Sequence, residues 1–213
     1  MSRPAPERLT IPGPVGSIEI AIEAPADIKG IALIAHPHPL FGGTMDNKVA
    51  HTLARTLRDL GYVALRSNFR GVGKTEGSHE HGKGETDDLL AVIDYARERF
   101  GDLPVALGGF SFGAFVQSLV AKRLKDAGMP IQRMVLVGTA AGMVTGARHY
   151  VTEGVPPDAL IIHGEVDETV PLVNVLEWAR PQDLPIVLVP GADHFFHGKL
   201  HCLKDIINRA WGR

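Results

Sequence analysis

The residues Pro104-Val105-Ala106-Leu107-Gly108-Gly109-Phe110-Ser111-Phe112-Gly113 decide how this chain folds. A continuous apolar run leads into Gly-x-Ser-x-Gly, and a segment with helical periodicity, Phe112 to Asp126, follows directly. Continuous apolar runs suit strands that are covered on both faces. The stretch therefore predicts a buried strand, a sharp turn at Ser111 and a helix. A serine on such a turn has a strained backbone, and small neighbours such as Gly109 and Gly113 let the turn close.

Strand and helix patterns alternate along the rest of the chain. The proline-containing opening dozen residues indicate an irregular lead-in, and the alternating Ser17 to Glu23 indicates an edge or antiparallel strand. Alternation of strand and helix predicts βαβ units, hence a mostly parallel sheet with helices on both faces. No repeat or linker divides the sequence, so residues 1–213 are expected to form a single domain. Further strands are expected at Gly30–Ala35, Tyr62–Arg66, Met134–Val137, Ala159–Ile162 and Pro185–Val189, and helices at Asn47–Leu60, Glu85–Phe100, Val170–Trp178 and Gly198–Trp211.

Composition excludes several classes of protein. The chain of 213 residues is 45% apolar and 22% charged with a net charge of −2, so a core is expected and a basic surface for nucleic acid is not. No apolar run approaches the roughly 20 residues that cross a bilayer, and no signal peptide is recognisable at the start. The single cysteine, Cys202, forms no intramolecular disulfide. We therefore expect a cytoplasmic protein without membrane or nucleic-acid partners.

Later strand ends supply the two partners that a nucleophilic serine needs. In this type of fold the order along the chain is serine, acid, histidine. Asp167 follows the strand expected to end near Ile162, and His194 follows the strand expected to end near Val189. The carboxyl ends of parallel strands meet at one edge of a sheet, so Ser111, Asp167 and His194 are predicted to converge as a catalytic triad.

Each partner has competitors. Glu165 and Glu168 are alternative acids in the same turn. The spacing of His194, His197 and His201 is His-x2-His-x3-His, which suits a metal on one helical face. We favour His194 as a base because it directly follows a strand, whereas the other two histidines are expected on the surface of the last helix. No metal and no cofactor are therefore expected.

The loop His36-Pro37-His38-Pro39-Leu40-Phe41-Gly42-Gly43 follows the strand Gly30–Ala35. A tetrahedral intermediate needs two preorganised N–H donors, one from the residue after the nucleophile and one from this loop. Phe112 supplies the first. Proline has no N–H, so the second comes from His38, with Leu40 as the alternative. The two histidine side chains of the loop can equally be structural.

Taken together, these motifs resemble the α/β-hydrolases, and among them the small lidless dienelactone hydrolase-like serine hydrolases. The resemblance extends from Gly30 to Trp211. It implies the triad given above, with oxyanion donors at His38 and Phe112. The dienelactone hydrolases proper use a cysteine where Ser111 stands, so their substrate is not carried over. The motifs are His36 to Met45 with Asn47-Lys48, Asn68 to Gly73, Gly109 to Gly113, His163-Gly164 with Asp167, and Asp193 to Phe196.

The expected activity is that of a metal-free serine esterase or thioesterase acting on a small acyl ester or thioester. A peptidase or amidase with the same residues, a metal-dependent hydrolase and a noncatalytic binding protein with a vestigial triad are the alternatives. The oligomeric state is left open.

Thr139 to Asp158 leaves room for a loop and one short helix and not for a cap domain, which favours a shallow site and short acyl chains. Arg70 is expected to pair with a carboxylate. Apolar residues that either wall the substrate pocket or belong to the core are Leu40, Phe41, Met45, Phe112, Phe195 and Phe196.

Overall fold

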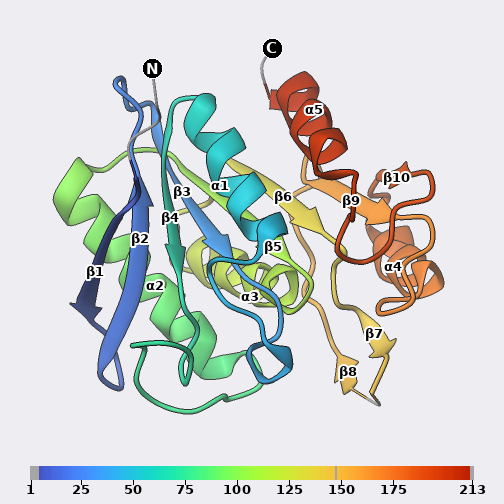
Figure 1. Cartoon of the computed structure of the whole chain (residues 1–213), viewed down its shortest axis with the longest axis horizontal. Helices are drawn as coiled ribbons and strands as arrows, with labels where there is room; N and C mark the ends of the chain where they lie inside the picture. The colour runs from blue at the N-terminus through green and yellow to red at the C-terminus, as the bar shows by residue number, and fades with distance from the viewer. Residues whose placement is uncertain (1–4, 147, 212–213) are drawn as a thin grey trace.

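The computed structural model describes residues 5–146 and 148–211 and contains, within them, an eight-stranded sheet in the order β1-β2-β4-β3-β5-β6-β9-β10 (Figure 1). Six neighbouring strands of this sheet, β4, β3, β5, β6, β9 and β10, run parallel to one another. Strand β2 is antiparallel to β4, and β1 is antiparallel to β2. The bounds are β1 Glu7–Pro12, β2 Ser17–Glu23, β3 Gly30–Ala35, β4 Tyr62–Ser67, β5 Val105–Phe110, β6 Arg133–Val137, β9 Leu160–Gly164 and β10 Ile186–Val189.

Helices cover both faces of this sheet, which gives the predicted three layers. Alternate residues of β3 enter different cores: Ile31 and Leu33 pack with α2 and α3, whereas Ala32 and Ile34 pack with α1 and α5. This two-sided burial explains why the strand reads as a continuous apolar run. No helix among the described residues is both long and apolar enough to span a membrane. The helices are η1 Pro39–Phe41, α1 Lys48–Asp59, α2 Lys83–Phe100, α3 Phe112–Asp126, α4 Leu172–Ala179, η2 Arg180–Gln182 and α5 Leu200–Trp211.

The expectation of an irregular lead-in was wrong for Glu7–Pro12, which form strand β1, and residues 1–4 lie outside the described part of the chain. Strand β1 pairs with β2 from Glu7 opposite Ile22 to Pro12 opposite Ser17, and so β2 is an interior strand. Proline is tolerated at Pro12 because an edge strand leaves its outward N–H positions unpaired. Ile11 is buried and ties this edge to the core.

A second difference lies between β6 and β9, where a loop with one short helix was expected. The segment forms a small antiparallel hairpin of β7 (Gly142–Val144) and β8 (Arg148–Tyr150). Strands of three residues are too short to show a period of two in the sequence. Among the described residues the segment contains no cap domain, as predicted.

The carboxyl ends of the parallel strands lie along one edge of the sheet; in Figure 1 the arrowheads of β3, β4 and β6 point toward the lower part of the picture and that of β9 points to the right. Strand β3 lies between β4 and β5, so the chain leaves β3 toward one side and later returns to its other side. In open α/β sheets the crevice at such a switch point is where ligands bind. Figure 1 shows η1 and the β7–β8 hairpin near this edge.

The turn from β5 to α3 has the conformation that the sequence predicts. Ser111 has φ 57° and ψ −120°, a region that residues with a side chain rarely adopt. A Cβ on Gly109 would lie 2.6 Å from Ala114 Cα, and one on Gly113 would overlap the carbonyl oxygens of Ala35 and His36. The two glycines therefore let α3 fold back tightly against β5 and β3.

We predict that Gly109→Ala lowers the free energy of unfolding by about 3 kcal/mol, because its new methyl group meets backbone that cannot rotate away. The neighbouring Gly108→Ala is the control: its Cβ would lie 3.4 Å from Ile34 Cγ1, at the edge of ordinary contact, and we expect less than about 1 kcal/mol. Urea unfolding measures both. Equal losses would contradict this account of the turn.

Candidate active site

Ser111 lies at the carboxyl end of β5, where its side chain meets a histidine. The distance from Ser111 Oγ to His194 Nε2 is 3.0 Å. The Ser111 N–H donates to the Val137 carbonyl at 2.9 Å, and the Ser111 carbonyl accepts the N–H groups of Ala114 and Ala140. These bonds fix the backbone of Ser111, and the residue is 7% exposed.

Asp167 holds the other nitrogen of the same ring. His194 Nδ1 and Asp167 Oδ2 are 2.7 Å apart. The second carboxylate oxygen, Oδ1, accepts the N–H groups of Thr169 at 2.9 Å and Val170 at 2.8 Å. Hydrogen bonds that involve a charged acceptor are among the stronger ones in proteins. The carboxylate is therefore fixed in position, and it fixes the orientation of the His194 ring.

Neither competing acid makes this contact. Glu165 accepts the N–H of Gly191 at 2.7 Å through Oε2, in an exposed position. Glu168 forms a hydrogen bond through its backbone: the Glu168 carbonyl oxygen accepts a hydrogen bond from the Thr145 hydroxyl. Of the three acids in the turn, Asp167 is the one that the structure joins to His194.

The competing histidines have other partners. His197 is exposed, and its Nδ1 lies 2.6 Å from Asp193 Oδ2. His201 is also exposed, and its Nε2 lies 3.4 Å from Cys202 Sγ. Among the described residues, no group of three or more histidine, cysteine, aspartate or glutamate side chains is placed to hold a metal.

Gly138 is a residue of this site that the sequence reasoning missed. It has φ 52°, and a Cβ there would lie 3.3 Å from Nδ1 and Cε1 of His194. Two aromatic rings, those of Phe110 and Phe195, also lie against the imidazole, with centroids 4.9 and 5.1 Å away. The available signal was a glycine directly after a strand on the carboxyl edge. Its role is to leave room for the histidine ring.

The loop after β3 brings a backbone N–H toward the start of α3. The His38 carbonyl accepts the N–H groups of Phe41 and Gly43, and its Nδ1 accepts the N–H of Leu40 at 3.3 Å. The Leu40 N–H is thus already used inside the loop. Phe112 is the first residue of α3, so its N–H has no partner within the helix. The rings of His38 and Phe112 lie 4.8 Å apart, which places the two predicted donor residues side by side.

The histidine side chains of this loop support its backbone. His36 is buried; its Nε2 accepts the N–H of Phe69 at 2.9 Å, so Nδ1 carries the proton that bonds the Pro37 carbonyl at 2.7 Å. Burial lowers the pKa of His36 to about 3. Burial, followed by the charges of His79 and Arg148, lowers the pKa of His38 to about 4. Both rings are therefore neutral near pH 7.

The six apolar residues expected in the pocket wall or the core fall into two groups. Leu40, Phe41 and Phe195 are exposed, so their side chains are available to a ligand. Met45, Phe112 and Phe196 have buried side chains, which is the core alternative that their apolar character left open. We keep the exposed residues as candidate substrate contacts.

Arg70 pairs with carboxylates, as predicted. Its Nε and Nη2 bond the two oxygens of Asp88 at 2.9 and 2.8 Å, and its Nη1 bonds Glu80 at 2.6 Å. The loop after β4 is thereby tied to α2, and the arginine is structural.

The β7–β8 hairpin joins the loops on the two sides of Ser111. On one side the N–H and hydroxyl of Thr145 donate to the carbonyls of Thr169 and Glu168, next to Asp167. On the other side the guanidinium carbon of Arg148 lies 4.2 Å from the centroid of the Phe41 ring. Sequence analysis did not find this bridge, because it depends on contacts between distant segments.

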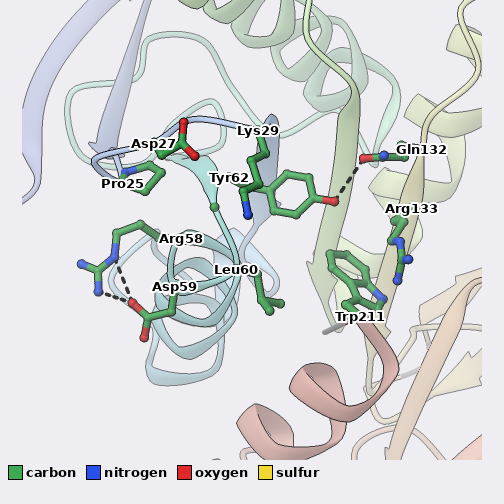
Figure 2. Close-up of a pocket in the computed structure, with 11 residues that line it drawn as sticks. Pro25, Asp27, Lys29, Arg58, Asp59, Leu60, Tyr62, Gln132, Arg133 and Trp211 are labelled. Atoms are coloured by element: carbon green, nitrogen blue, oxygen red, sulfur yellow. Dashed lines mark hydrogen bonds and ion pairs between the residues drawn. The ribbon is translucent and has the colours of Figure 1, made fainter. Parts of the chain in front are cut away.

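A separate cavity of about 640 Å³ opens at the opposite, amino edge of the sheet. Figure 2 shows the hydroxyl of Tyr62 directed at Gln132 Oε1, at 3.1 Å, and Arg58 paired with Asp59. Its described lining contains no serine, threonine, cysteine or histidine. This cavity therefore lacks the nucleophile and base that the carboxyl edge brings together.

The α/β-hydrolase fold places a serine at positive φ between a central strand and a helix, and it supplies the acid and the histidine from later strand ends. The chain has this fold. It belongs to the family described as serine aminopeptidase, S33, which matches residues 40–175.

Solved structures and curated relatives agree with this assignment. An α/β serine hydrolase without a lid from Xanthomonas campestris is 34% identical, with a TM-score of 0.86 over 99% of this chain and 95% of that one. An α/β serine hydrolase homologue from Coxiella burnetii is 37% identical, with a TM-score of 0.83 over 98% and 99%.

Among curated relatives, an uncharacterized protein of Rickettsia prowazekii is 32% identical over 92% of this chain and 84% of its own length. A lysophosphatidylserine lipase of Danio rerio is 28% identical over 76% of this chain, which spans only 35% of that protein.

We predict that His36 makes the protein less stable in acid. Its folded pKa, about 3, is below the ordinary 6.5, so its contribution to stability is complete above pH 6.5 and is lost as the pH falls toward 3. Relative to His36→Gln, which keeps an acceptor for Phe69, the wild-type free energy of unfolding should fall by about 1.4 kcal/mol per pH unit between pH 6 and 4. Urea unfolding at each pH measures it, and parallel slopes would refute the prediction.

Proposed function

We propose that this protein is a carboxylesterase or thioesterase that cleaves small acyl esters through Ser111, His194 and Asp167. The observation that carries the proposal is the continuous path of hydrogen bonds from the Ser111 hydroxyl through the His194 ring to the Asp167 carboxylate. A nucleophile, a base and an orienting group in hydrogen-bond contact are the parts that acyl transfer needs.

The contacts assign a role to each atom. Nδ1 of His194 donates to Asp167, which leaves Nε2 unprotonated and 3.0 Å from Ser111 Oγ. As Oγ attacks the acyl carbon, Nε2 takes the serine proton, and the carboxylate stabilises the imidazolium. The imidazolium then protonates the leaving group. Water, deprotonated by the same nitrogen, then attacks the acyl carbon; the bond to Oγ breaks, His194 returns the proton to Oγ, and the acyl group leaves as a carboxylic acid.

The negative oxygen of the tetrahedral intermediate needs donors that are in place before the reaction. We assign this role to the N–H groups of His38 and Phe112. The Leu40 N–H already bonds His38 Nδ1, which favours His38 over the alternative donor. The positive end of the α3 dipole lies at the same point and adds to the stabilisation.

The size of the substrate follows from what borders the site. Between β6 and β9 the described residues form two three-residue strands and the loops around them. Such a border buries few acyl methylenes, each worth about 0.8 kcal/mol. We therefore propose short acyl chains of about two to six carbons, without activation at lipid interfaces. A small-molecule ester is the proposed partner, and a cytoplasmic location stays a prediction.

A peptidase or amidase with the same residues is the second candidate, because the matching family is described as a serine aminopeptidase. An amide nitrogen must be protonated before it leaves, which places a greater demand on His194 than an ester does. Turnover of acyl esters, thioesters and amides by one preparation separates the candidates.

We predict that Ser111→Ala and His194→Ala each lower kcat on a short-chain p-nitrophenyl ester by about 10⁴ to 10⁶, since triad members act as one unit. Asp167→Asn should cost less. His197→Ala is the control, because its ring bonds Asp193 on the surface, and it should leave kcat unchanged. Steady-state kinetics over acyl chains of two to twelve carbons supplies the measurement.

Full activity in Ser111→Ala, or a larger loss from His197→Ala than from His194→Ala, would disprove the assignment of the triad. A kcat/KM that keeps rising to twelve carbons would disprove the short-chain proposal alone.

We predict that His38→Pro lowers kcat by about 10² to 10³, as expected for the loss of one oxyanion donor. His38 has φ −56°, which proline adopts without strain, so this change removes the N–H and the ring and leaves the backbone path. His38→Ala removes the ring alone and should be mild. If the two variants lose the same activity, the imidazole participates and the assignment of the N–H is wrong.

A further inference from the structure

Arg148 on β8 is a cation at the border of the proposed active site. Its guanidinium carbon lies 4.2 Å from the centroid of the Phe41 ring, and Phe41 is 66% exposed. A guanidinium over an aromatic face is attracted by the ring quadrupole. The side chain is thus held in place at the surface rather than extended into solvent.

The Arg148 guanidinium has polar partners within the hairpin but no carboxylate partner among the described residues. Its Nε and Nη2 both donate to the Thr145 carbonyl, at 3.2 and 2.7 Å. Within the described part of the chain, no carboxylate forms an ion pair with Arg148. The Tyr150 hydroxyl is a further, uncharged neighbour that interacts with the guanidinium. The positive charge thus has no carboxylate partner among the described residues, and two parallel guanidinium N–H groups can bind a carboxylate or phosphate in bidentate fashion.

A chain of ring contacts links Arg148 to the residues of the proposed oxyanion donors. The Phe41 ring beneath it lies edge-on to His38 at 4.9 Å, and His38 lies 4.8 Å from Phe112. On the same strand, the ring of Tyr150 lies 6.0 Å from Phe112. Strand β8 therefore contacts Phe112 through Tyr150 and the loop that carries His38 through Arg148 and Phe41.

The other ionisable groups on this side do not neutralise the arginine. His79 lies 4.7 Å from the His38 ring and 2.7 Å from Glu85, which is fully buried and accepts the N–H groups of Glu80 and Gly82. The charge of Arg148 is felt at His38, where it contributes to the lowered pKa. An anionic group on a bound substrate would meet an arginine without a competing carboxylate.

We propose that Arg148 determines specificity by binding an anionic group, a carboxylate or a phosphate, that the ester carries a few bonds from its scissile carbonyl. This inference rests on the proposed esterase function and narrows its substrate class to negatively charged short-chain esters. Exposed Leu40 and Phe41 supply apolar contact for the carbon chain between the two groups. Arg148 touches the substrate in this arrangement and leaves the chemistry to Ser111.

Three p-nitrophenyl esters of equal chain length test the proposal: the butyrate, which is neutral, the monosuccinate, which ends in a carboxylate, and the 3-phosphonopropionate, which ends in a phosphonate. The proteins are wild type, Arg148→Gln, Arg148→Lys and Arg55→Gln. Arg55 is exposed on α1, so its variant changes the net charge equally at a distant place. Ser111→Ala supplies the background rate, because a neighbouring carboxylate also hydrolyses its own ester.

We expect Arg148→Gln to lower kcat/KM by about 10- to 100-fold for the esters with a terminal anion, and by less than about twofold for the butyrate. Arg148→Lys should retain part of the preference, and Arg55→Gln all of it. The anionic ester with the larger wild-type kcat/KM identifies which of the two anions the site prefers.

Equal losses on all three esters would overturn the proposal, since they would show that Arg148 only holds the hairpin on Phe41. Unchanged kinetics in Arg148→Gln would overturn it as well. A folded wild-type protein that hydrolyses none of the esters would instead overturn the proposed function, and the role of Arg148 with it.

Discussion

Helix α3 lies against the carboxyl end of β3 so closely that a single added carbon on Gly113 would overlap two carbonyl oxygens. This contact sets the position of everything at the site. It brings the first N–H of α3 beside the loop that carries His38, and it holds Ser111 at positive φ with its hydroxyl directed at His194. Any residue larger than glycine at position 113 would separate helix and loop.

Hydrogen bonds from buried side chains to backbone keep this contact in register. Gln117 on α3 donates to the carbonyls of Leu33 and Gly108, and so joins the helix to β3 and β5. His36 accepts the Phe69 N–H and joins β3 to the loop after β4. Buried polar groups are costly unless they are paired. Each of these pairs therefore favours one arrangement of neighbouring strands over its alternatives.

The sequence predicts the features that depend on patterns of neighbouring residues. The buried strand, the glycine-flanked turn and the order of Ser111, Asp167 and His194 are local patterns, and the parallel topology places their strand ends together. The hairpin β7–β8 was missed because three-residue strands show no period. Arg148 was missed because its partner, Phe41, is distant in the sequence and a stacking contact leaves no local pattern. Strand β1 was missed because the prolines near it suggested a loop, whereas the segment is held in a strand by its pairing with β2.

The backbone of Ser111 also limits which nucleophiles this scaffold accepts. At φ 57° a side chain branched at Cβ is strongly disfavoured, so threonine is excluded although it carries the same hydroxyl. Side chains with one substituent on Cβ, such as cysteine or aspartate, fit the same turn. A change of chemistry on this scaffold is therefore achieved by exchanging the reactive side-chain atom at position 111 while the backbone stays unchanged. The surrounding loops then determine which substrate that atom attacks.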